Sequence, residues 1–281
     1  MLAGPMSPVS PLTTSMPAAG QVLLWIYTNP ARRVHDSAFY KWHEAERMPA
    51  LLDIPESLFL SCTRWIAADR KTPTYLSLYD LALRSTVHDP EYIALNEKHA
   101  LETRQAEFVE SRVYEPVDVL CPSPTWTTDS ITTDEYAPSR YITVVEADLA
   151  MFAESEFCRW YDEEHILLLS RVPGWVRSRR FVLQEVLGVE ATDPDQELSG
   201  GETEMDSDGG SEGEQERRPE WTQGMRILPD RPPKFLAIHE WTSLDVFETK
   251  QYRHATTTPW RTEVLKADRV LRYHIRAFRA S

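Results

Sequence analysis

The chain has 281 residues, of which 42% are hydrophobic, and a formal net charge of −14, which allows two modest domains and disfavours nucleic acid as a partner, because phosphate binding requires a basic surface. Its three cysteines form no CxxC pair, which indicates neither a zinc ribbon nor a disulfide framework and predicts a reducing, cytoplasmic location. No run approaches the roughly 18 apolar residues of a membrane helix, so no membrane association is expected.

Strand-like alternation and longer helical patterns follow one another in the order strand, helix, strand, strand, helix, strand, and this order occurs twice. In a first unit, residues 21–120, the predicted elements are Val22–Thr28, Asp36–Asp53, Leu58–Ala67, Tyr75–Leu81, Pro90–Glu110 and Arg112–Leu120. In a second unit, residues 139–281, they are Tyr141–Ala147, Glu154–Arg171, Val176–Leu183, Phe235–Trp241, Asp245–Ala267 and Arg269–Phe278. Each unit is predicted to be a ferredoxin-like βαββαβ fold of the α+β class.

Three stretches are predicted to lie outside these elements. Residues 1–20 are rich in Pro, Ser and Ala and are predicted to form a disordered tail. Residues 121–138 are dense in Pro, Ser and Thr, which is typical of a linker. Residues 185–232 are predicted to be a disordered acidic insertion, because the stretch from Glu185 to Glu220 holds thirteen acidic and two basic residues.

The two units share residues as well as pattern. The block FYKWHEAERMPALLDIPE at 39–56 aligns without a gap on FCRWYDEEHILLLSRVPG at 157–174, and PTYLSLYDL at 73–81 aligns on PKFLAIHEW at 233–241. Matching blocks in the same order indicate an internal duplication. A ferredoxin-like sheet has one bare face, so tandem repeats that cover each other predict an intramolecular pseudo-dimeric α/β barrel.

These blocks resemble the EthD-like members of the dimeric α/β-barrel superfamily, and in particular fungal-type tandem members with a W-Y-x-x-E-H helix followed by P-G-W/F. The superfamily includes cofactor-free monooxygenases, lactone isomerases, haem enzymes, decarboxylases and dehydratases of aromatic polyketides in secondary metabolism, and stress proteins without known chemistry. The resemblance therefore implies the fold and a pocket between sheet and helices, but not one reaction. Arg47 occupies the position of His165 in the first unit, so the motif is complete only in the second.

The helix around WYDEEH contains the candidate catalytic residues. On an ideal helical wheel Glu164 falls on the buried arc and His165 at its edge. A buried carboxylate beside an imidazole suits proton abstraction from an acidic carbon or proton delivery to a leaving group. Glu164 and His165 are therefore the predicted proton-handling pair, with His239 as a facing donor. The predicted substrate-binding residues are Trp160, Tyr161, Trp42, His43, Glu46 and Tyr79.

A structural interpretation of the same residues is also open. Glu164 could pair with Arg180, and Glu46 with Arg64, each fixing a helix against the sheet. In that case Trp42, Trp160 and Trp175 would be core residues, and His165 a polar residue without a role.

The sequence supports two classes of function. The first is a cofactor-independent lyase, isomerase or oxygenase that acts on a hydrophobic, aromatic or polyketide-like small molecule. The second is a non-catalytic barrel that binds a small ligand or a protein partner. No metal cluster, GxGxxG or P-loop motif occurs, so no cofactor is expected, with haem as a minority alternative from the resemblance. The chain is expected to be a monomer with an internal pseudo-dimer or a homodimer.

Overall fold

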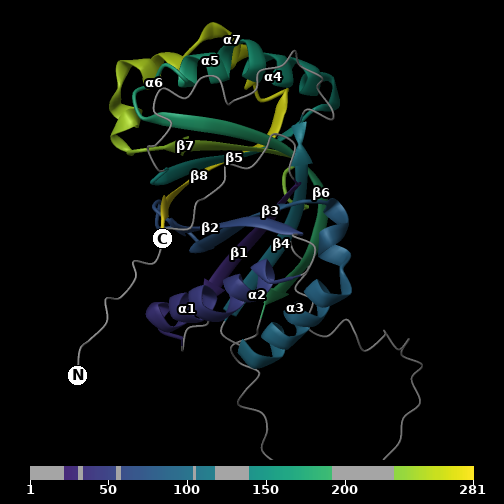
Figure 1. The fold of residues 1–281 in the computed structure, drawn as a ribbon. Coiled ribbons are helices and arrows are strands. Elements are labelled where there is room, and N and C mark those ends of the chain that lie inside the picture. Colours follow the sequence, from purple (N-terminus) through teal and green to yellow (C-terminus); the bar gives the residue numbers. More distant parts are fainter. Residues whose placement is uncertain (1–21, 31–33, 55–57, 104–105, 118–138, 192–230) are drawn as a thin grey trace, which may run out of the picture.

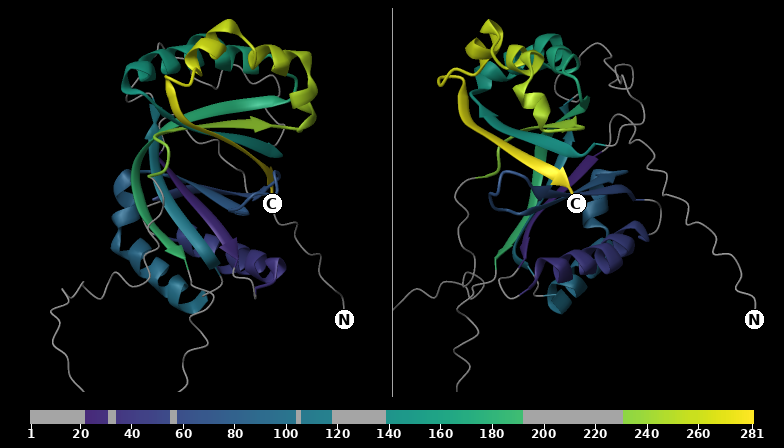
Figure 2. Two further views of the ribbon diagram at one scale, coloured as in Figure 1. Left: turned by 180° about the vertical axis from the view of Figure 1, so that it is seen from behind. Right: turned by 90° about the vertical axis from the view of Figure 1, so that its left-hand side faces the viewer.

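The computed structural model describes residues 22–281, apart from 31–33, 55–57, 104–105, 118–138 and 192–230. Eight strands form a closed antiparallel barrel in the order β1-β3-β2-β8-β5-β7-β6-β4. The helices lie outside the barrel in two groups on opposite sides of it, α1 to α3 on one side and α4 to α7 on the other (Figures 1 and 2). Of the residues placed, none belongs to a helix with the length and apolar character needed to cross a bilayer.

Each half of the chain contributes four strands and its own helices. The first half contains β1 (Val22–Pro30), α1 (Asp36–Trp42), α2 (Met48–Leu52), β2 (Phe59–Ala67), β3 (Tyr75–Leu81), α3 (Pro90–Thr103) and β4 (Ala106–Pro116). The second half contains β5 (Tyr141–Leu149), α4 (Glu154–Trp160), α5 (Ile166–Leu169), β6 (Trp175–Ala191), β7 (Phe235–Trp241), α6 (Lys250–Ala255), α7 (Pro259–Val264) and β8 (Val270–Ala280). The predicted order of strands and helices is confirmed in both halves.

The strand order within each half is the same, and the halves join edge to edge. The first four strands pair as β4-β1-β3-β2 and the last four as β8-β5-β7-β6. The pairs β2–β8 and β4–β6 close the barrel. Every strand of the barrel therefore has a hydrogen-bonded neighbour on both sides, which leaves no open sheet edge among the strands described.

The largest differences from the predicted boundaries occur at three places. The helix predicted over Pro90–Glu110 ends at Thr103, and β4 starts at Ala106 because residues 106–111 pair with β1. The helix predicted over Asp245–Ala267 is divided into a 3₁₀ turn (Asp245–Glu248), α6 and α7. The division has a local cause: Thr249 and Thr258 each cap the helix that follows, and Pro259 begins α7.

The third boundary is the start of the predicted insertion. β6 continues past Leu183 to Ala191 and pairs with β4 along this extension, for example Val189 with Glu110. Residues 185–191 therefore belong to the barrel. The predicted tail and linker, and residues 192–230 of the predicted insertion, lie outside the described residues.

Strand alternation separates an inner core from two outer cores. Side chains pointing inward include Leu23, Trp25, Leu76, Leu78, Ile142, Val144, Leu236 and Ile238. On the outer face, α2 and α3 cover Leu24, Ile26, Tyr79 and Leu81, and α4 covers Val145, Ala147, Phe235 and Ala237. Since β7 presents Phe235 and Ala237 outward, His239 also faces the helices.

The inner core holds a buried ionic cluster that connects the two halves. Arg112 on β4 donates to both carboxylate oxygens of Glu110 at 2.9 Å and also to Glu146 on β5. It donates in addition to the hydroxyl of Tyr114 at 3.2 Å. The three charged side chains are 7–9% exposed, so a cation that lost its partners here would be costly.

Candidate functional site

A π-helical turn interrupts the helix that carries the predicted catalytic residues. Residues Tyr161–His165 are π-helical between α4 and α5, and the amide of Ile166 donates to the carbonyl of Tyr161. Residues i and i+5 lie about 140° apart around an α-helix but come together in a π turn. Trp160 and His165 consequently stack, with ring centroids 4.4 Å apart and an interplanar angle of 22°.

The π turn changes which side chains are buried. His165 is only 6% exposed, whereas Glu164 is half-buried. The ideal helical wheel, which assumes 100° per residue throughout, predicts the reverse ranking and is wrong here. A π turn occurs at the aligned residues of the first half, His43–Arg47. Such turns are frequent at functional sites.

Glu164 connects the π turn to α7. Its Oε1 accepts hydrogen bonds from the indole Nε1 of Trp160 at 3.0 Å and from the hydroxyl of Thr258 at 2.5 Å. The sequence left open an ion pair of Glu164 with Arg180 and one of Glu46 with Arg64. In both halves the arginine instead lies near the acidic residue two positions earlier in the helix. Asp162, and not Glu164, pairs with Arg180.

The second displaced pair lies in the first half. Arg64 lies 3.8 Å from Glu44, and Glu46 is exposed.

Tyr161, His165 and His239 form a buried group beneath the π turn. The rings of Tyr161 and His239 are parallel within 6°, with centroids 6.1 Å apart, and the centroids of the two histidines are 5.9 Å apart. His165 Nδ1 lies 3.3 Å from the carbonyl of Ala255, and His239 Nδ1 lies 2.8 Å from the hydroxyl of Ser178. Within the described structure, His239 Nε2 and the Tyr161 hydroxyl have no hydrogen-bond partner.

Burial determines the protonation of this group. It lowers the pKa of His239 to about 4, with a further contribution from the charge of Arg180. It also lowers the pKa of His165 well below its usual value, with His239 and Arg261 adding to the effect. Burial raises the pKa of Tyr161 well above its usual value. At pH 7 the group therefore consists of two neutral imidazoles, which can accept protons, and one protonated phenol.

The buried imidazoles should make the protein sensitive to acid. The unfolded chain protonates His239 near pH 6.5 and the folded chain only near pH 4, so the stability from this residue is complete above pH 6.5 and is lost progressively as the pH falls from 6.5 to 4. We expect about 2 kcal/mol of loss from His239 between pH 7 and pH 5. Urea unfolding of His239→Gln should show a shallower pH dependence than wild type. His254→Gln, at an exposed position, should retain the wild-type slope.

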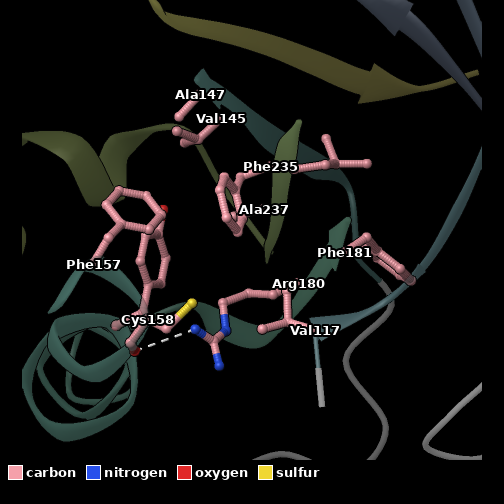
Figure 3. Close-up of a pocket in the computed structure, with 11 residues that line it drawn as sticks. Val117, Val145, Ala147, Phe157, Cys158, Arg180, Phe181, Phe235 and Ala237 are labelled. Carbon is pink, nitrogen blue, oxygen red and sulfur yellow. Dashed lines mark hydrogen bonds between the residues drawn. The ribbon is translucent and has the colours of Figure 1, made fainter. Parts of the chain in front are cut away.

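A pocket lies beside this group, between α4 and the outer face of the sheet (Figure 3). Its empty volume is about 280 Å³, which includes the part open to solvent. Its wall is mostly apolar and aromatic. The lining residues are Val117, Val145, Ala147, Phe157, Cys158, Tyr161, Arg180, Phe181, Phe235, Leu236 and Ala237.

Tyr161 is the predicted site residue that lines this pocket. Trp160, Glu164, His165 and His239 do not line it, although His165 and His239 contact the Tyr161 ring. Sequence reasoning did not assign Arg180 or Phe157 to the pocket. The available signal was alternation along the strands, because it places Arg180 on the same face of the sheet as Ala237, its partner in the β6–β7 pair.

The predicted residues of the first half form a related but different group. His43 Nε2 lies 3.1 Å from the hydroxyl of Ser77 and 3.4 Å from that of Tyr79. His43 aligns with Tyr161, and Tyr79 with His239. Histidine and tyrosine have thus exchanged places between helix and strand in the two halves. Trp42 is half-buried beside this pair, with its ring centroid 6.4 Å from that of His43.

Metal and haem binding place different demands on the site. Among the residues placed by the structure, no three His, Cys, Asp or Glu side chains group as metal ligands. A haem requires a large cavity with an axial ligand at its wall. The lining offers Cys158 and Tyr161 in place of a histidine, and burial raises the pKa of Tyr161, which disfavours the phenolate that would bind iron, so the site fits a haem poorly.

Similar proteins are found by structure and not by sequence. No protein-family model matches the chain, and no curated protein matches it in sequence. A candidate monooxygenase from Lactobacillus acidophilus NCFM shares 8% identity at a TM-score of 0.48, covering 92% of this chain and 93% of its own. An anthrone oxidase-like protein shares 10% identity at a TM-score of 0.46, covering 93% and 91%.

A third similar structure is a mutant chlorite dismutase from Candidatus Nitrospira defluvii in complex with cyanide. It shares 9% identity at a TM-score of 0.48, covering 94% of this chain and 92% of its own.

Proposed function

We propose that the protein is an enzyme that moves protons to and from a hydrophobic, aromatic or polyketide-like small molecule in the pocket beside α4. Its reaction is of the lyase, isomerase or oxygenase type and needs no cofactor. Removal of a proton from an acidic carbon is a first step that these reaction types can share. The observation that carries the proposal is the contact between an aromatic pocket and a buried group with two neutral imidazoles and an unpartnered phenol.

The side chains have separate proposed roles. Tyr161 lines the pocket and donates a hydrogen bond to the substrate oxygen on which negative charge develops. His239, through its free Nε2, and His165 are the proposed proton carriers; both contact the Tyr161 ring but do not line the pocket, so the Tyr161 hydroxyl relays the proton between the substrate and them. Glu164 holds Trp160 and the start of α7 in place, and thereby fixes the ring of His165 that stacks on Trp160.

The proposal is tested with 2-tetralone, a hydrophobic bicyclic ketone with acidic C–H bonds next to its carbonyl group. Deuterium exchange of these protons in D₂O is followed by NMR. The wild-type protein should accelerate exchange over buffer, and His165→Asn and His239→Asn should each lower the acceleration by about 10². His254→Asn is the control and should be unchanged. Exchange at the buffer rate with wild-type protein would remove the catalytic proposal.

A non-catalytic ligand-binding barrel is the second candidate. The observation in its favour is that Glu164 is already bonded to Trp160 and Thr258 and, like both histidines, does not line the pocket. This alternative predicts saturable binding of aromatic molecules without any exchange. The two functions are therefore separated by measuring binding and exchange on the same sample.

We propose in addition that the chain is a tandem, EthD-like member of the dimeric α/β-barrel superfamily, in which two ferredoxin-like copies form an intramolecular pseudo-dimer. Three features support this: the aligned sequence blocks, the equal strand order of the two halves, and π turns at aligned positions. A monomer in solution is the corresponding proposal for its assembly.

A further inference from the structure

Among the described residues that line the pocket, Arg180 is the one with a charged side chain. It reaches the pocket from β6, and Figure 3 shows its guanidinium group directed toward Cys158, whose carbonyl accepts a hydrogen bond at 3.4 Å. The guanidinium also pairs with Asp162 and lies over the ring of Tyr161, 5.4 Å from its centroid. Desolvating a charge at the wall of an otherwise apolar pocket costs free energy, so a cation at this position indicates a binding role.

The hydrogen-bonding capacity of Arg180 is only partly used. A guanidinium has five N–H donors in a planar fork, and the bonds to Asp162 and Cys158 engage two of them. Arginine binds carboxylates through two parallel hydrogen bonds, which makes it suited to a planar anionic group. Donors therefore remain for a ligand at the wall of the pocket.

The first half has an arginine at the matching position of its sheet. Arg64 pairs with Ser77 on β3 in the register in which Arg180 pairs with Ala237 on β7. The guanidinium of Arg64 lies over the rings of Phe39 and Tyr75, at 5.5 and 4.9 Å from their centroids. In the first half, the arginine thus covers the two aromatic rings.

The second half has the same components in another arrangement. Phe157 and Phe235 align with Phe39 and Tyr75, and both line the pocket. Asp162 is hydrogen-bonded to Arg180, whereas its counterpart Glu44 lies 3.8 Å from Arg64. The ion pair with Asp162 therefore holds Arg180 over the ring of Tyr161 at the wall of the pocket, whereas Lys234 lies over the ring of Phe235, 5.1 Å from its centroid.

We infer that the pocket binds planar aromatic molecules that carry a carboxylate or phenolate, with the ring against Phe157 and Phe235 and the anionic oxygen on the guanidinium of Arg180. The inference rests on the proposed function in one respect, namely that this pocket receives the aromatic ligand. It adds the chemical class of the ligand and the residue that selects it.

The test compares two probes of nearly equal shape, 2-naphthoate and the neutral 2-acetylnaphthalene, by isothermal titration calorimetry. Wild-type protein should bind the anion at least about tenfold more tightly, as expected for a charge-assisted bond. Arg180→Met should bind both probes equally. Because this variant removes only the cation of the ion pair, the double variant Arg180→Met/Asp162→Asn removes both charges and should give the same result. Arg64→Met, at the matching register position, should keep the wild-type preference.

The outcomes separate this inference from the proposed function. Equal binding of both probes by wild type, or a preference that survives in the double variant, would overturn the inference while leaving an aromatic pocket. If the wild-type protein bound neither probe, both the inference and the proposed function would be overturned. If binding of 2-naphthoate were preferred through Arg180 but the protein did not accelerate exchange of 2-tetralone, the inference would be supported and the proposed catalytic function would be overturned.

Discussion

Arg112→Met should destabilise the protein by about 3–5 kcal/mol, the usual cost of leaving buried charges without their partner. Inside the barrel, Arg112 and Glu110 on β4 contact Glu146 on β5, and all three side chains are buried. Its removal leaves two carboxylates close together without a cation. Urea unfolding at pH 7 provides the measurement.

The control for this variant is an ion pair at the surface. Lys266 and Glu263 form an exposed i,i+3 pair on the second half, and Lys266→Met should cost no more than about 1 kcal/mol. The triple variant Arg112→Met/Glu110→Gln/Glu146→Gln removes the charges together and should recover part of the lost stability. A single Arg112→Met variant as stable as wild type would show that the cluster does not contribute to holding the halves together.

Tyr161→Phe should lower the acceleration of 2-tetralone exchange by about 10² without changing the stability of the fold. The hydroxyl of Tyr161 is buried and has no hydrogen-bond partner among the described residues, so its removal breaks no bond. The change in the free energy of unfolding should therefore stay within about 0.5 kcal/mol. Exchange followed by NMR and urea unfolding, on the same preparation, test both parts.

Tyr114→Phe is the matched control for this variant. The hydroxyl of Tyr114 is also buried, but it accepts a hydrogen bond from Arg112 at 3.2 Å on the inner side of the barrel. Its removal should cost about 1–3 kcal/mol, because the bond is made to a charged group, and should leave exchange unchanged. If Tyr161→Phe retained full exchange, the hydroxyl would have no part in the proposed chemistry.

The strands were predictable because their signal is local. Alternation along β1, β3, β5 and β7 defines one inward and one outward face, and these elements are found within two residues of their predicted ends. The extension of β6 to Ala191 was not predictable in the same way. Its glutamates at 185 and 190 resemble those of the acidic stretch that follows, and only pairing with β4 places them in the sheet.

The site was predictable in its members but not in its geometry. WYDEEH identified Trp160, Tyr161 and His165, and the strand alignment identified His239, all of which the structure brings into contact. The π turn has no reliable signature in the sequence. The ideal helical wheel therefore predicted Glu164 to be more buried than His165, whereas the structure shows the opposite. The partner of Arg180 depends on the same turn.

Both four-stranded sheets lie in one polypeptide, and this has an evolutionary consequence. In a barrel assembled from two identical subunits, every mutation appears in both, and a change that ruins one site ruins its twin. Here each codon affects one side only. Selection can therefore keep Tyr161 and His239 beside the pocket while His43 and Tyr79, at the aligned positions, change independently of them.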